Sequence, residues 1–335
     1  MNWKAKISLV SLLLIPVVVL VALGILWLQP DATSMDVESD PFFQEASWLG
    51  PGGHELIPNL QEAEIITPDR PHDPIEARTP EKLAQVSRRR HFLISTNSMG
   101  LRGPELPAKT DFRILCLGES VTFGWGVSAA EAYPAQLADR LGVDVINAGI
   151  PAMRPGHMAR WLQRHAASIQ ADLILFTVRP DWMQPDPWAD YFQSIRSAQR
   201  IVAPTPIAVV LPPISTFDIR GTRQRGEELA QLEANLQDVP WIDLTPAFRE
   251  ALPTEGVTLT LNGDTQQMID RRSNAVLVEA TPTDPLSLAP EIVDALEADH
   301  NLVEPLMFDG AHPDADGFVV FAHVVASFIE QQGWR

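Results

Sequence analysis

Three residues in two distant stretches of the chain have side chains suited to nucleophilic catalysis. Ser120 stands in ILCLGESVTFGWG (residues 114–126), where an apolar run leads directly into a turn. A serine hydroxyl becomes nucleophilic only when a base takes its proton and a third group orients that base. Asp309 and His312 lie three residues apart in FDGAHPDADG, close to the C-terminus. This spacing lets the carboxylate fix the tautomer of the imidazole, while the other ring nitrogen faces a serine.

Three other motifs do not fit the stretch around Ser120. A dinucleotide fingerprint needs G-x-G-x-x-G and a phosphate loop needs Gly-Lys followed by Ser or Thr, and GESVTFGWG contains neither. The nucleophile elbow of α/β-hydrolases, G-x-S-x-G, requires glycine at the position of Thr122. The α/β-hydrolase fold is therefore disfavoured, and we expect neither a cofactor nor a metal site.

Short apolar segments alternate with helical patterns in the C-terminal two thirds of the chain. The predicted strands are 112–118, 143–149, 172–178, 206–212 and 239–244, and the predicted helices are 131–141, 153–168, 222–237 and 315–330. Nearly continuous apolar runs are typical of strands that are covered on both faces. The alternation predicts an α/β fold, a doubly wound three-layer sandwich with a parallel sheet of about five strands. Ser120 follows the first strand, at the carboxyl edge where such sheets bind ligands.

Composition excludes one class of partner. The chain of 335 residues has 25 Lys and Arg against 43 Asp and Glu, a formal net charge of −18, so we expect no nucleic-acid partner. The single cysteine, Cys116, allows no internal disulfide and lies within the first predicted strand. Burial there favours a packing role over a reactive one.

The N-terminus contains a candidate membrane anchor. Residues 7–28 form a stretch of 22 residues without a charge. As a helix this stretch reaches about 33 Å, enough to cross a bilayer. Lys4 and Lys6 precede it and acidic residues follow, which places the tip of residues 1–28 in the cytoplasm and the body in the periplasm or outside the cell. A cleaved signal peptide is the alternative, but its apolar region would be shorter.

Two further segments flank or interrupt the body, which we assign to residues 109–335. Residues 29–108 carry five prolines between positions 58 and 80 and predict an extended or irregular spacer. In this spacer the run of arginines at 88–90 fits a solvated face better than a lipid-binding patch. Residues 253–305 are predicted to be an insertion, with strands in VTLTL and NAVLVEA and a helix over 288–299. This insertion is either a lid over the site or a surface segment that does not contact substrate.

Three tryptophans lie in predicted loops: Trp125, Trp182 and Trp188. They could stack on a sugar or an acyl chain, or they could pack in the protein.

Several of these blocks resemble the GDSL or SGNH hydrolase family. They are Gly118-Glu119-Ser120 after the first strand, INAG at the end of the second, and the Asp-x-x-His turn before the last helix. TNSMGLRGPE (96–105) also looks like the lead-in of membrane-anchored or exported members. The resemblance covers about 97–335, with a gap in register around 253–305. It implies Ser120 as nucleophile, His312 as base, Asp309 as its partner, and the N–H groups of Ser120 and Gly149 as oxyanion donors.

The sequence departs from this family at one block. The family places an asparagine after the third strand as an oxyanion donor, but the matching text FTVRPDW has Pro180 there. Proline has neither an amide side chain nor a backbone N–H, and losing one oxyanion donor costs about 3–4 kcal/mol of transition-state stabilisation. Arg179 is a candidate replacement donor, and the alternative is an exposed arginine paired with an acid. Glu119, in place of the usual aspartate, is tolerable.

The resemblance implies a membrane-tethered serine esterase that forms an acyl-enzyme. Its expected substrates are acylated saccharides of the cell envelope or lipid esters. Two alternatives remain open at this point. The acyl group passes to a sugar hydroxyl instead of water, or the protein is a non-catalytic binding module that kept the fold and lost the asparagine.

Overall fold

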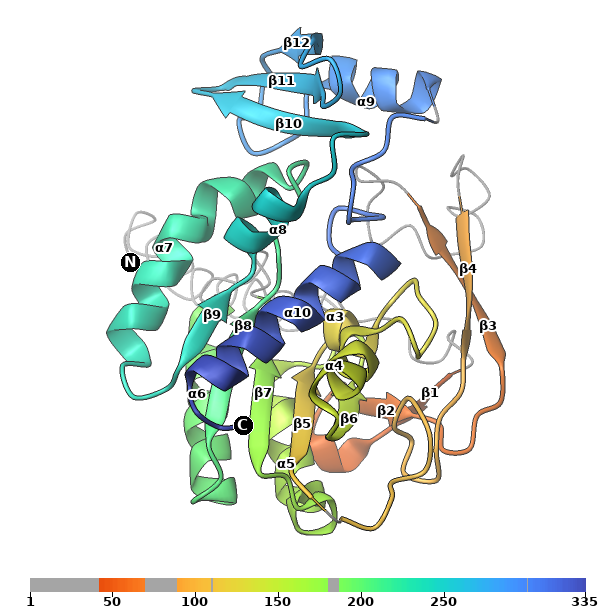
Figure 1. Cartoon of the computed structure of the whole chain (residues 1–335), viewed down its shortest axis with the longest axis vertical. Helices are drawn as coiled ribbons and strands as arrows, with labels where there is room; N and C mark the ends of the chain where they lie inside the picture. The colour runs from red at the N-terminus through yellow and green to blue at the C-terminus, as the bar shows by residue number, and fades with distance from the viewer. Residues whose placement is uncertain (1–41, 70–88, 110, 180–186, 300) are drawn as a thin grey trace, which may run out of the picture. The chain divides into compact units, whose positions relative to one another are not determined.

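A sheet of five parallel strands forms the centre of the fold (Figure 1). The computed structural model describes residues 42–69, 89–109, 111–179, 187–299 and 301–335, all within a unit that spans Pro41–Arg335. The strands are β5 (Arg113–Gly118), β6 (Asp144–Gly149), β7 (Leu173–Thr177), β8 (Ile207–Leu211) and β9 (Trp241–Asp243), in the order β6-β5-β7-β8-β9. This is the flavodoxin-like doubly wound order. The predicted α/β fold with five parallel strands is confirmed.

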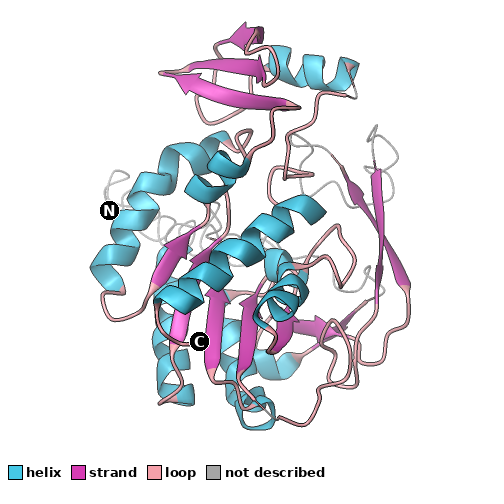
Figure 2. Cartoon of the chain, viewed as in Figure 1, coloured by secondary structure: helices cyan, strands magenta, loops and turns pink. Residues whose placement is uncertain are grey.

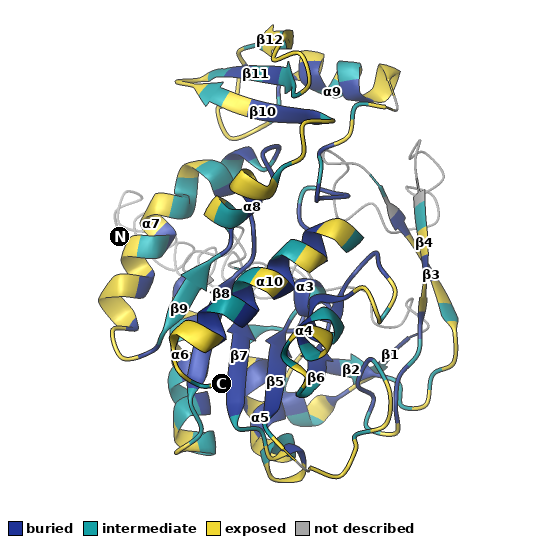
Figure 3. Cartoon of the chain, viewed as in Figure 1, coloured by how far each residue is buried: buried dark blue, intermediate teal, exposed yellow. Residues whose placement is uncertain are grey.

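Helices cover both faces of this sheet (Figures 1 and 2). On one face α4 (Tyr133–Leu141) packs against α10 (Ala315–Gln331), and the Tyr133 and Phe321 rings stack with centroids 4.2 Å apart. On the other face α5 (Pro155–Ile169) packs against α6 (Pro187–Val202). Every residue of β5, β7 and β8 is buried between these layers (Figure 3), which explains their continuous apolar sequences. Of these helices, α6 is the one that the sequence analysis did not predict.

The segment predicted to be a spacer folds onto the body wherever the structure describes it. Its strands are β1 (Phe43–Glu45), β2 (His54–Leu56), β3 (Ala63–Pro68) and β4 (Arg89–Ile94), paired β1 with β2 and β3 with β4, and a short 3-10 helix, η1, covers Ser47–Leu49. Phe42, Leu49 and Leu56 are almost fully buried. The Phe42 ring lies 6.1 Å from that of Trp125, which follows the Ser120 turn, and Trp125 Nε1 donates to Thr67 Oγ1 at 3.1 Å. This segment therefore belongs to the body, because tertiary packing buries its scattered apolar residues.

The predicted insertion at 253–305 forms a small subdomain around its own core. Strands β10 (Val257–Asn262), β11 (Thr265–Asp270) and β12 (Val276–Ala280) make an antiparallel sheet beside α9 (Pro290–Ala298). Its core includes Leu259, Met268 and Ile292 and also takes in Phe217 and Ile219, where α7 (Ile219–Asn235) begins. The helix and two of the strands were predicted, and β11 was not. Before this subdomain, a short helix, α8 (Thr245–Ala251), follows β9 of the central sheet.

Predicted membrane residues fall outside the described part of the chain. Residues 7–28, expected to form an anchor, are not among the described residues. Within the described ranges, every helix is too short or too polar to cross a bilayer.

Candidate active site

A sharp strand-to-helix turn presents Ser120 at the carboxyl edge of the sheet. β5 ends at Gly118, and Ser120 is the first residue of a one-turn helix, α3 (Ser120–Phe123). A Cβ atom on Gly118 would lie 2.3 Å from Thr122 Oγ1 and 3.0 Å from the carbonyl oxygen of Thr177. Only glycine lets this turn pack so closely against its own helix and against the end of β7. The Ser120 side chain is consequently half-buried at the edge where the sequence placed it.

The structure brings Ser120, His312 and Asp309 together. His312 Nε2 lies 2.8 Å from Ser120 Oγ, although the two residues are 192 positions apart in the chain. His312 Nδ1 lies 2.8 Å from Asp309 Oδ2 and 3.0 Å from Oδ1. Asp309 Oδ1 also accepts from the backbone N–H groups of Ala311, at 2.7 Å, and His312, at 2.6 Å. One turn therefore fixes both the carboxylate and the imidazole.

Electrostatics keep Asp309 ionised beside the imidazole. Burial alone would raise the pKa of Asp309, but the charge and hydrogen bond of His312 and two backbone N–H groups outweigh it and hold the pKa below its usual value. An ionised carboxylate can only accept, so Nδ1 of His312 carries the proton. The lone pair of Nε2 then faces Ser120, which is the arrangement a general base requires.

One of the two backbone N–H groups predicted as oxyanion donors is unpaired among the described residues, whereas that of Gly149 is not. No described residue accepts the N–H of Ser120, which is the first, unpaired N–H of a helix. The N–H of Gly149 instead donates to Asn147 Oδ1 at 3.0 Å. A Cβ on Gly149 would lie 2.1 Å from the nitrogen of Phe123. This glycine thus allows β6 to approach α3, a role different from close approach to substrate.

A residue that the sequence analysis missed lies in the turn after β6. Ala152 has a left-handed conformation with φ of 57°. Such a conformation is uncommon for a non-glycine residue and is typical of functional sites. His54 of β2 holds this turn through a 2.8 Å contact between its Nε2 and the carbonyl oxygen of Pro151. No described residue accepts the N–H of Ala152, so a second free donor lies at this edge of the sheet.

The structure does not favour the predicted oxyanion role of Arg179 or the predicted stacking role of Trp125 and Trp188. The Arg179 guanidinium lies 3.5 Å from Asp218 Oδ2, which agrees with pairing to an acid rather than a role as oxyanion donor. Pro180 and Trp182 lie outside the described residues. Trp125 and Trp188 are only 1% and 5% exposed, so their rings pack in the core and do not offer a stacking surface. Cys116 is fully buried in the core, which confirms its packing role, and this burial raises the pKa of its thiol to about 12.

Tyr191 and Arg90 support the site from elements that the sequence did not connect with it. The Tyr191 hydroxyl donates to the Glu119 carboxylate and lies 2.9 Å from the carbonyl oxygen of Arg179, which ties the end of β5 to the end of β7. Phe308 stacks on His312 with ring centroids 5.7 Å apart, and the Arg90 guanidinium lies 4.4 Å from the Phe308 centroid. Arg90, expected to be on a solvated face, therefore packs against the ring that stacks on His312.

A buried arginine in TNSMGLRGPE holds the chain that leaves α3. Arg102 donates to the carbonyl oxygens of Phe123 at 2.8 Å, Gly124 at 2.6 Å and Val127 at 2.5 Å. Burial lowers its pKa to about 10, so the guanidinium remains charged at neutral pH. A positive charge at the C-terminus of a helix is also favoured by the helix dipole. This motif therefore acts structurally, by fixing the turn that carries Ser120.

Replacing Arg102 with methionine should destabilise the protein strongly. The substitution removes three hydrogen bonds from a charged donor, each worth about 1.5–3 kcal/mol. The carbonyl groups of Phe123 and Gly124 keep a second donor, Asn147 Nδ2 and the N–H of Val127, whereas that of Val127 keeps none among the described residues. We expect the free energy of unfolding to fall by about 3 kcal/mol or more, measured by denaturant titration. Arg196→Met, which removes a surface arginine paired with Asp238, is the control. Equal stability of the two variants would contradict the structural role of Arg102.

Comparison with known proteins adds likeness in structure only. No family model matches the sequence, and no curated protein matches it. Among solved structures, a G-D-S-L family protein from Desulfitobacterium hafniense is similar over 65% of this chain and 99% of its own, with 14% identity and a TM-score of 0.40. A family two carbohydrate esterase from Clostridium thermocellum is similar over 73% of this chain and 69% of its own, with 10% identity and a TM-score of 0.41. The periplasmic domain of a Salmonella lipopolysaccharide acetyltransferase covers 42% of this chain and 68% of its own, with 13% identity and a TM-score of 0.29. Likeness this low assigns no activity, so the case for function rests on the geometry of the site.

We also searched the described residues for a set of side chains that could bind a metal ion. There, no group of three or more His, Cys, Asp or Glu residues is placed to hold an ion. Asp309 is bound to His312, and His312 is bound to Ser120. The site as described offers a serine hydroxyl, an imidazole held by a carboxylate, and backbone N–H groups.

Proposed function

We propose that the protein is a serine-dependent esterase that works through an acyl-enzyme. The single observation that carries this proposal is the continuous hydrogen-bonded row from Asp309 through His312 to Ser120, with 2.8 Å at each step. A serine alone is unreactive, and this row supplies the base and the orienting carboxylate that activate it. The free N–H of Ser120 supplies a donor for the negative charge that develops on the ester oxygen.

The geometry supports a reaction in two halves. Ser120 Oγ attacks the ester carbonyl carbon while His312 Nε2 takes the hydroxyl proton, and Asp309 stabilises the imidazolium that forms. The tetrahedral intermediate then expels the alcohol, which receives the proton from His312, and leaves the acyl group on Ser120. Water loses a proton to His312 and attacks this acyl group. Ser120 recovers its proton from His312 as the acid leaves.

The proposed setting is the outer face of a membrane. It rests on the uncharged stretch at 7–28, with lysines before it and acids after it, which favours an anchor and a body in the periplasm or outside the cell. Esters within reach of such a tether include acylated envelope saccharides and lipid esters. A non-catalytic binding module is less consistent with the site, because it has no need of a buried Asp-His pair aimed at a serine.

Hydrolysis of p-nitrophenyl acetate tests the proposal. We expect the purified protein to release p-nitrophenol above background and to form free acetate. Adding an oligosaccharide distinguishes hydrolysis from transfer, because acetylated sugar would replace acetate as the product if the acyl group passes to a hydroxyl. Release at the buffer rate would favour the binding module and overturn the proposal.

A further inference from the structure

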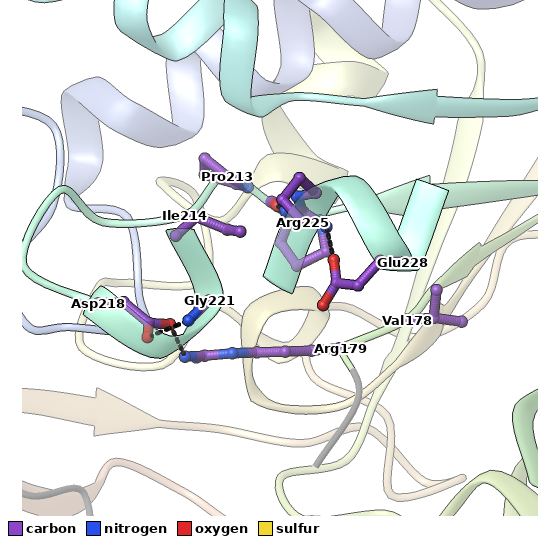
Figure 4. Close-up of a pocket in the computed structure, with 9 residues that line it drawn as sticks. Val178, Arg179, Pro213, Ile214, Asp218, Gly221, Arg225 and Glu228 are labelled. Carbon is purple, nitrogen blue, oxygen red and sulfur yellow. Dashed lines mark hydrogen bonds and ion pairs between the residues drawn. The ribbon is translucent and has the colours of Figure 1, made fainter. Parts of the chain in front are cut away.

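A polar pocket opens beside the site, between the ends of β7 and β8 and the first turns of α7 (Figure 4). Its walls include Arg179 after β7, Pro213 and Ile214 after β8, and Asp218, Arg225 and Glu228 of the α7 segment. The Arg179 side chain extends toward Asp218, and Arg225 meets Glu228 (Figure 4). None of these side chains takes part in the proposed chemistry at Ser120.

The pocket and Ser120 lie at the same edge of the sheet. β5 and β7 are parallel neighbours in which Leu117 lies opposite Phe176. Ser120 comes three residues after Leu117, and Arg179 comes three residues after Phe176, so both follow the same end of the sheet. Neighbouring strands are about 4.8 Å apart. The Tyr191 hydroxyl, which contacts both Glu119 and the carbonyl oxygen of Arg179, holds the two strand ends together. A ligand group bound against Arg179 is therefore one strand away from the nucleophile.

Donors and acceptors are mixed in this pocket. Apart from the 3.5 Å pair with Asp218, the Arg179 guanidinium has no partner among the described residues, so its N–H groups can donate to a ligand. Glu228 Oε2 accepts from Arg225 at 2.6 Å, and no described residue donates to Oε1. Burial raises the pKa of Glu228 to about 7, so near neutral pH this carboxyl group can both accept and donate.

The charges of the pocket exclude two kinds of ligand. Asp218, Glu228 and Asp243 accompany the guanidinium groups of Arg179 and Arg225, so there is no excess positive charge to hold an anion. An alkyl chain would cover charged groups without replacing their hydrogen bonds, which is unfavourable. A hydroxyl group both donates and accepts, and a cluster of hydroxyls matches the mixed lining.

We propose that this pocket binds the sugar part of the substrate, so that the ester acts as an acylated saccharide rather than a lipid ester. The inference rests on the proposed esterase function and names its substrate class. Arg179 and Glu228 act as binding residues for sugar hydroxyls, and Ser120 receives the acyl group. The alcohol released in the first half-reaction is the sugar.

Two acetyl esters that differ only in their alcohol test this proposal. The full chain is assayed with 6-O-acetylglucose and with p-nitrophenyl acetate, in the wild type, Arg179→Ala and Glu228→Gln. We expect the ratio of kcat/KM for the sugar ester to that for p-nitrophenyl acetate to fall about tenfold in each variant, mainly through KM, as the loss of one or two hydrogen bonds predicts. Arg196→Ala, another surface arginine paired with an aspartate, should leave the ratio unchanged.

The other outcomes overturn the inference in distinguishable ways. A ratio that stays unchanged in Arg179→Ala and Glu228→Gln, while the wild type cleaves both esters, would remove the sugar site and leave the esterase function intact. An equal loss with both esters would place Arg179 or Glu228 at the acyl centre instead. If the wild type cleaves neither ester, the esterase function fails and the sugar site fails with it. Asp218 keeps its bond to the N–H of Gly221 in both variants, so α7 retains its cap, and thermal unfolding checks that the variants are folded.

Discussion

Ser120→Ala should lower kcat/KM for p-nitrophenyl acetate by about 10³-fold or more, to the rate that binding and backbone donors alone sustain. His312 Nε2 lies 2.8 Å from the hydroxyl at 120, and alanine has no hydroxyl that could give its proton to this nitrogen. The variant should fold normally, because a half-buried serine loses little when its hydroxyl is removed. Initial rates of p-nitrophenol release measure the effect.

Ser128→Ala is the matched control for this experiment. Ser128 follows α3 in the same loop and is exposed. Its replacement should leave kcat/KM within about twofold of the wild type, since surface substitutions away from special features change little. Equal activity of Ser120→Ala and Ser128→Ala would contradict the assignment of the nucleophile.

Asp309→Asn should lower kcat by about 10³- to 10⁴-fold while the turn stays folded. In the native turn Asp309 Oδ1 accepts from two backbone N–H groups, and the carbonyl oxygen of asparagine can keep these bonds. The amide NH₂ group then faces Nδ1 of His312, which must accept, so the ring proton moves to Nε2. A protonated Nε2 cannot take the proton of Ser120. Steady-state kinetics with p-nitrophenyl acetate should show this loss in kcat, with a small change in KM.

A control substitution at an exposed aspartate distinguishes the effect of Asp309→Asn on the imidazole from a general effect of losing one negative charge. Asp316 lies in the first turn of α10 and is exposed, and Asp316→Asn should keep wild-type kcat. If Asp309→Asn retained more than about a tenth of the wild-type kcat, the carboxylate would not be orienting the base as the 2.8 Å contact indicates.

The sheet could be predicted from sequence because its burial is extreme. β5, β7 and β8 are buried at every position, and this forces continuous apolar runs that sequence alone displays. Helix α6 carried a signal that was overlooked: its buried residues recur at helical spacing, at Trp188, Tyr191, Ile195 and Ala198. Strands β1 and β2 have three residues each, too few to show any period. They are held by contacts with residues distant in the chain: Phe42, just before β1, lies against Trp125, and His54 of β2 contacts the carbonyl oxygen of Pro151.

The residues proposed to react could be predicted from sequence, whereas the residues that support them could not. Ser120 and the Asp309–His312 turn have local signatures, because the chemistry demands those residue types at those spacings. Arg102 acts by donating to backbone carbonyls of a distant loop, and any residue type offers a carbonyl. Gly149 could be singled out, but its role could not, since the contact that requires glycine is with the backbone of Phe123.

Covalent labelling of Ser120 tests the central claim most directly. The protein is treated with a fluorophosphonate, which reacts with serine hydroxyls that a neighbouring base activates, and is then digested and mapped by mass spectrometry. The hydrogen-bonded row predicts one label, on Ser120, in the wild type and none in His312→Ala. An unlabelled wild type, or a label on another residue with Ser120 intact, would contradict the proposed nucleophile and the acyl-enzyme that depends on it.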